Sequence, residues 1–161
     1  MELSTQEIII RLVIATVLSG LIGIERELRE KPAGVRTNAL IGLGSAVMAL
    51  VGAYAYALWP ETTDPTRLAS IVVQGVGFLG AGAIIQAAGS VRGLTTAATM
   101  WVVAGIGIAA GLGLYVPAFA TAGIVLVLLV IFGPLDARLM GTEEERERRG
   151  GWLLGGKSKK K

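Results

Sequence analysis

The sequence predicts an all-α fold, a polytopic membrane helix bundle with five transmembrane helices, and three observations support this prediction. Hydrophobic residues make up 53% of the 161-residue chain, whereas charged residues make up 17%. The mean hydropathy is +0.65, so a water-soluble globule of this composition would lack the polar surface to cover itself. The charges also lie between apolar runs of the length needed to cross a bilayer, about 20 residues.

Five apolar runs account for the expected spans, which cover residues 8–24, 38–58, 68–88, 97–114 and 118–132. The third run holds only Gln74 and Gln86 as long polar side chains and is expected to be the central helix of the bundle. The tight connection at residues 111–117 also fits a short helical hairpin or a re-entrant segment. We therefore divide the chain into a five-span transmembrane domain, residues 1–134, and a charged cytoplasmic tail, residues 135–161.

The basic residues set the expected orientation of the spans. The connection after the first span contains four basic residues, Arg26, Arg29, Lys31 and Arg36. Residues 59–67 contain one basic residue, Arg67. By the positive-inside rule, the first of these connections faces the cytoplasm. Five crossings then place the N-terminus outside and the C-terminus in the cytoplasm, in agreement with the basic residues that follow the last span. Arg11 lies near the external boundary, where it can snorkel, and is given no special role.

Glycine is the second feature of the spans, with 23 residues in the chain, most of them inside apolar runs. In lipid, glycine lets two helix backbones approach closely. Residues 75–82 match the GxGxxG spacing of dinucleotide-binding loops, but they lie inside an apolar span and follow no predicted strand. We therefore interpret six glycines as helix-packing positions: Gly75, Gly77, Gly80, Gly82, Gly107 and Gly111. The GxxxG pair at the end of this set could pack within the subunit or between two subunits, and a homo-oligomer, with a dimer favoured, is expected.

Charged and hydroxyl side chains flank the spans on the expected cytoplasmic side. We name them the cytoplasmic charge cluster: Glu25, Arg26, Glu27, Lys31, Arg36, Thr37, Arg92, Thr95 and Thr96. Glu25 is expected to face Arg36 or Arg92 across this rim. The charges would act as solvated anchors, as structural ion pairs or as a docking site for a partner. The threonines would cap the fourth helix or, with Arg92, form a pocket for an anion.

The residues that are missing limit the function. The chain has no His and no Cys, which excludes thiol redox chemistry, disulfides and imidazole-based sites. The middle of the predicted spans holds no carboxylate, the group that a hard divalent cation prefers, and no base that would activate a serine or threonine. We expect no enzyme activity, no metal site and no cofactor. The net charge of +3 is better explained by membrane lipid than by nucleic acid.

Four blocks, GIERE, KPAGVRT, GxGFLGAGAII and VRGLTTAATMW, occur in this order and together resemble the MgtC/SapB family between residues 20 and 114. The resemblance implies a five-span protein of the bacterial plasma (inner) membrane, linked to low-magnesium adaptation and, in pathogens, to survival in macrophages. It also implies regulation of partner membrane proteins, notably the proton-translocating ATP synthase. It adds Pro32, Gly34 and Gly93 to the motif residues named above. Members of the MgtC branch continue into a soluble C-terminal domain, so this chain resembles a short, SapB-like member or a truncated one.

Two functions are compatible with the sequence. The preferred one is a non-enzymatic regulator that binds another membrane protein through its packing faces and cytoplasmic rim. The alternative is a small transporter or channel for a cation such as magnesium, with a path lined by carbonyls or formed in an oligomer.

Overall fold

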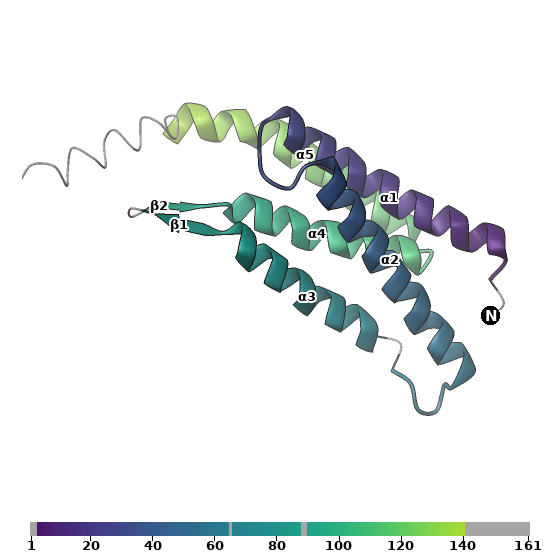
Figure 1. The fold of residues 1–161 in the computed structure, drawn as a ribbon. Helices are drawn as coiled ribbons and strands as arrows, with labels where there is room; N and C mark the ends of the chain where they lie inside the picture. Colours follow the sequence, from purple (N-terminus) through teal and green to yellow (C-terminus); the bar gives the residue numbers. More distant parts are fainter. Residues whose placement is uncertain (1–2, 65, 88–89, 141–161) are drawn as a thin grey trace, which may run out of the picture.

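The structure is a computed structural model that describes residues 3–64, 66–87 and 90–140. Its five helices are α1 (Thr5–Leu28), α2 (Val35–Leu58), α3 (Arg67–Ala83), α4 (Leu94–Gly111) and α5 (Tyr115–Met140), and a two-stranded antiparallel hairpin, β1 (Ile85–Ala87) with β2 (Ser90–Arg92), joins α3 to α4. The α1–α2 connection and the hairpin lie at one end of the bundle, and the α2–α3 and α4–α5 connections lie at the other (Figure 1).

Helix α4 is the centre of the bundle, because it contacts every other helix. Half of α4 is buried, whereas Val76 and Gly80 are the buried residues of α3. The expectation that the third helix is central was therefore wrong. Alanine and glycine recur along α4, and these small residues allow neighbouring helices to approach it from several sides.

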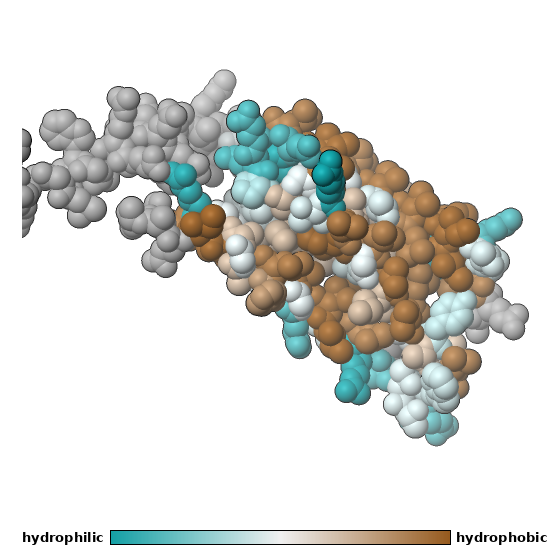
Figure 2. All heavy atoms as spheres, viewed as in Figure 1, coloured by the Kyte–Doolittle hydropathy of each residue, from teal (hydrophilic) through white to brown (hydrophobic). Residues whose placement is uncertain are grey.

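Four helical segments are long and apolar enough to cross a membrane: α1, α2, α4 and Tyr115–Gly133 of α5. Apolar side chains cover most of the visible face between the two ends of the bundle (Figure 2). The fifth helix, α3, has 17 residues and is about 25 Å long, somewhat less than the ~30 Å hydrocarbon core of a bilayer. The chain is thus a multi-pass membrane protein with four full-length candidate spans and one shorter helix.

The third predicted span, residues 68–88, was too long, because the helix ends at Ala83. After this point Ile85 pairs with Arg92 in the hairpin, and isoleucine and valine favour strands over helices. Gly93 ends the hairpin at φ +87°, and a Cβ atom there would overlap the carbonyl oxygen of Ala83. Only glycine fits this close approach between the end of α3 and the start of α4.

Two helices continue past the C-terminal ends of the predicted spans. Helix α1 continues through the GIERE motif to Leu28, because Glu, Arg and Leu are good helix formers. Helix α5 continues past residue 132 to Met140. The α4–α5 connection is a turn in which Gly113 has φ +78°, so a tight turn within residues 111–117 joins two long helices. Residues 141–161 of the predicted tail lie outside the described residues.

Candidate functional site

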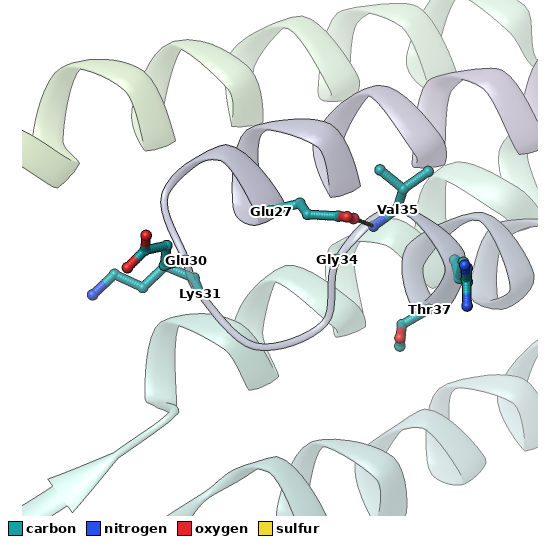
Figure 3. Close-up of a pocket in the computed structure, with 7 residues that line it drawn as sticks. Glu27, Glu30, Lys31, Gly34, Val35 and Thr37 are labelled. Atoms are coloured by element: carbon teal, nitrogen blue, oxygen red, sulfur yellow. Dashed lines mark hydrogen bonds between the residues drawn. The ribbon is translucent and has the colours of Figure 1, made fainter.

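Glu27 caps the start of α2 from the neighbouring helix. The N-cap residue of α2 is Gly34, which has no side chain to accept a hydrogen bond. Glu27 Oε2 accepts a hydrogen bond from the backbone N–H of Val35 at 3.0 Å (Figure 3). A Cβ atom on Gly34 would lie 2.6 Å from this oxygen. A carboxylate at a helix N-terminus accepts from a free amide and complements the helix dipole, so this contact fixes α2 relative to α1.

The backbone of the α1–α2 connection is held in an uncommon conformation. Glu30 and Ala33 have φ angles of 55° and 59°, in the left-handed region that non-glycine residues rarely adopt. Asn38 is fully buried, and its Nδ2 donates to the carbonyl oxygens of Ala33 and Gly34. Because a buried amide donates hydrogen bonds to the carbonyls of this turn, the α1–α2 connection has a defined conformation.

Glu25 is paired within its own helix. Its carboxylate lies 2.9 Å from Arg26 Nε and 2.6 Å from Arg29 Nε. The expected pairing across the rim was wrong for Arg36, which is exposed at the start of α2. The reason is that α1 does not stop at Ile24, so Arg29 lies one helical turn after Glu25. Neither of these two contacts has hydrogen-bond geometry, so the arginines stabilise the Glu25 carboxylate through their charge. Both carboxylate oxygens are buried, so a ligand cannot reach them.

Arg29 also joins α1 to α5. Its Nη2 donates to the carbonyl oxygen of Val130 at 3.2 Å. In a regular helix this carbonyl would accept from the residue four positions later, but that residue is Pro134, which has no N–H. Gly133 leaves room for the guanidinium, since a Cβ atom there would lie 3.2 Å from Arg29 Nη1. This role of Arg29 was not predicted from the sequence, although the proline inside the last helix was the available signal.

A shallow pocket surrounds the start of α2 (Figure 3) and is lined by Glu27, Glu30, Lys31, Gly34, Val35, Arg36 and Thr37. Four of these are predicted members of the cytoplasmic charge cluster. Lys31, Arg36 and Thr37 are exposed, and Figure 3 shows Glu30 and Lys31 pointing away from the rest of the lining, whereas Glu27 points to Val35. The cluster therefore has an inner part fixed by internal contacts and an outer part that is accessible.

The remaining cluster members, Arg92, Thr95 and Thr96, lie where the hairpin meets α4. The N-cap residue of α4 is Gly93 and makes no side-chain cap, so the expectation that the threonines cap this helix was wrong. Thr96 is buried and Thr95 is exposed. The structure thus divides the predicted cluster between two neighbouring connections at one end of the bundle (Figure 1).

Three of the six predicted packing glycines lie close to a neighbouring helix, and the other three do not. A Cβ atom on Gly107 would lie 2.8 Å from Ser45 Cβ, and one on Gly111 would lie 2.8 Å from Ala46 Cα, so the GxxxG pair brings α4 against α2. Gly80 is near Ala97 of α4, at 3.4 Å from its Cβ. The other three glycines, Gly75, Gly77 and Gly82, have open space around their Cβ positions.

Arg11 closes the opposite end of the bundle and was also missed by sequence analysis. It is 7% exposed, forms an ion pair with Glu7 and donates from Nη1 to the carbonyl oxygen of Gly111 at 3.0 Å. Cations stabilise helix C-termini by this kind of contact.

In the α2–α3 connection at the same end, the hydroxyl and N–H of Thr66 donate to Asp64 and hold the pKa of its carboxyl below the usual value.

Metal-binding chemistry is not apparent in the part of the chain that the structure describes. No group of three or more acidic side chains lies close enough there to hold a metal ion, and the sequence contains no His or Cys.

Comparison with known proteins gives one family and several relatives. A family model described as the MgtC family matches residues 12–138. The chain is 45% identical over 140 residues to the "Putative magnesium transporter YhiD" of Escherichia coli (strain K12), covering 84% of this chain and 65% of that protein. It is 45% identical over 131 residues to "Protein MgtC" of Salmonella typhimurium (strain LT2), covering 81% and 54%, and 40% identical over 143 residues to "Protein MgtC" of Salmonella typhi, covering 88% and 60%. The chain therefore spans 54–65% of the length of these relatives. No solved structure matches it.

Proposed function

This chain belongs to the MgtC family, and from this premise we propose that it is a non-enzymatic regulator that binds another protein in the bacterial inner membrane during adaptation to low magnesium. Family membership confirms the resemblance found in the four sequence blocks.

The observation that carries the proposal is that the acidic side chains of α1 are already used inside the protein. Glu7 pairs with Arg11, Glu25 lies between two arginines, and Glu27 caps α2. Magnesium binding calls for carboxylate or carbonyl oxygens that remain available. At the charged end, the accessible groups include Lys31, Arg36 and Thr37, which suit ion pairs with an acidic partner surface. Apart from the capping Glu27, Glu30 is the exposed carboxylate beside them, and one carboxylate is fewer than the several oxygen ligands that a magnesium site requires.

The proposed topology has five crossings, with the N-terminus outside. Basic residues gather at the end that holds the α1–α2 connection and the hairpin: Arg26, Arg29, Lys31, Arg36 and Arg92. The other end holds Glu61 and Asp64 in the α2–α3 connection. The charge distribution supports a cytoplasmic position for the basic end. A cysteine introduced by Thr63→Cys should react with an impermeant thiol reagent in intact cells, and labelling only after lysis would refute this orientation.

Magnesium transport is the second candidate, and the name of the YhiD relative favours it. Transport by this chain would have to use backbone carbonyls or a path formed between subunits. The described helices offer no free carboxylate in the middle of a span, so the regulator remains the better supported function.

Two measurements on the same purified protein separate these functions. The first is magnesium uptake into liposomes that contain a magnesium-sensitive dye, and we expect no uptake above protein-free liposomes. The second is capture from bacterial membranes, with the ATP synthase followed by immunoblot. Capture should be lost in the double variant Lys31→Gln/Arg36→Gln and kept in Arg67→Gln, a matched control at the other end. Protein-dependent magnesium uptake without capture would refute the regulator and support the transporter.

A further inference from the structure

The outer face of α3 has an unusual composition for a helix that faces lipid. Gln74 lies within one residue of the middle of α3 and is exposed. It has no hydrogen-bond partner among the described residues. An unpaired amide is costly in hydrocarbon, where no water can bind to it. Lipid alone is therefore a poor cover for this position.

The residues around Gln74 would let another helix come close. At about 100° per residue, Ser70, Gly77 and Ala81 lie within about 60° of Gln74 on the helix surface. All three are exposed, and Gly77 has open space at its Cβ position. The buried residues Val76 and Gly80 lie on the other side of α3, toward α4. The α3 surface is thus polar at Gln74 and small on the side of Ser70, Gly77 and Ala81. Phe78, which is 81% exposed, lies about 40° from Gln74 on the other side and borders this face.

We propose that two copies of this chain associate through the α3 face formed by Ser70, Gln74, Gly77 and Ala81. An amide carries both a donor and an acceptor, so it is complementary to itself. A twofold axis along the membrane normal keeps both α3 helices at the same depth, and the two Gln74 side chains then meet near the middle of the bilayer. The small neighbours allow the backbones to approach closely enough for this pairing.

This face differs from the other exposed surfaces of the bundle. Gly123 of α5 also has open space around it, but its neighbours on that helix are apolar, such as Ile124 and Val127, which suit lipid directly. The dimer is also independent of the proposed partner binding, because the α3 face and the Lys31–Arg36 surface lie on different elements.

Crosslinking tests the proposal, because the chain contains no cysteine. Gly77→Cys should form a disulfide-linked dimer when membranes are oxidised, since disulfides need Cα atoms within about 7 Å. Gly123→Cys is the matched control at an equally open glycine and should remain monomeric. Equal crosslinking of the two variants would overturn the proposal, as would linkage of Gly77→Cys to a different protein only.

A second variant tests the role of the amide. Gln74→Leu replaces the amide by an apolar side chain of similar volume, which lipid accommodates, so the monomer should fold. In detergent titrations its dimer should dissociate about three- to thirtyfold more readily than the unmodified dimer, the range expected for interhelical polar contacts. An unchanged dissociation constant, or a chain that is monomeric without any substitution, would show that Gln74 does not join two copies.

Discussion

The contact between Arg29 and the Val130 carbonyl allows a direct test of how α1 is joined to α5. Arg29→Met removes the guanidinium but keeps most of the apolar stem. The carbonyl of Val130 then loses its donor, and Glu25 loses one of the two arginines described beside it. Pro134→Ala should compensate for the first loss, because an alanine at this position provides the N–H that proline lacks.

The expected magnitude follows from these two contacts. An unsatisfied carbonyl costs about 1–3 kcal/mol when buried. Arg29 is 31% exposed, so water reaches this end of the helices and the lower value, about 1 kcal/mol, applies. Loss of the ion pair to Glu25 adds a similar amount. We therefore expect Arg29→Met to cost about 2 kcal/mol in the original chain and about 1 kcal/mol in the Pro134→Ala chain.

The assay is a double-mutant cycle on the free energy of unfolding in detergent, measured for the original chain, both single variants and the double variant. The cycle removes the general gain in helix propensity that replacing a proline brings. Arg36→Gln is the control, since this exposed arginine should change stability by less than about 0.5 kcal/mol. Additivity of the two substitutions within about 0.3 kcal/mol would refute the role of Arg29 as the donor that replaces Pro134.

Three further predictions concern other contacts. Glu27→Ala removes the cap of α2 and should lower the free energy of unfolding by about 1 kcal/mol, with Glu27→Gln losing less because its amide oxygen still accepts; equal losses would argue against capping. Gly107→Leu should prevent stable folding in detergent, whereas Gly105→Leu, which enters open space on the same helix, should fold normally. Thr66→Val removes a hydroxyl that lowers the pKa of Asp64, so this pKa should rise in an NMR titration; because it is depressed in the folded state, its contribution to stability is present above the unfolded pKa and is lost as the pH falls through the folded value. An unchanged Asp64 pKa in Thr66→Val would exclude the hydroxyl as the cause.

The helices could be predicted because hydrophobicity along the chain is a local property. The roles of Glu25 and Glu27 could not, because they depend on where α1 ends. A prediction that stops this helix at residue 24 places both carboxylates in a loop, and four more helical residues turn Glu25 toward Arg29 and Glu27 toward the start of α2.

The glycines show a similar limit. The GxxxG pair of α4, which was expected to allow close packing, lies against α2. The same reasoning applied to α3 gave the wrong central helix, because a glycine shows where an approach is possible but not whether a neighbour is present. The hairpin was missed because Ile84 and Ile85 extend the apolar run, although the β-branched residues there and at Val91 indicated strands.

The hydrogen bond from Arg11 to the Gly111 carbonyl has a consequence for biosynthesis, because its two residues are 100 positions apart in the chain. The first helix enters the membrane before the fourth has been translated. During this interval Arg11 has its ion pair with Glu7 one turn away, which offsets its charge. The acceptor for Arg11 Nη1, the Gly111 carbonyl oxygen, is in place only when α4 reaches the same end of the bundle. The fourth helix therefore completes the hydrogen bonding of the first, and a ribosome stalled before α4 would leave Arg11 of α1 without this acceptor at the edge of the bilayer.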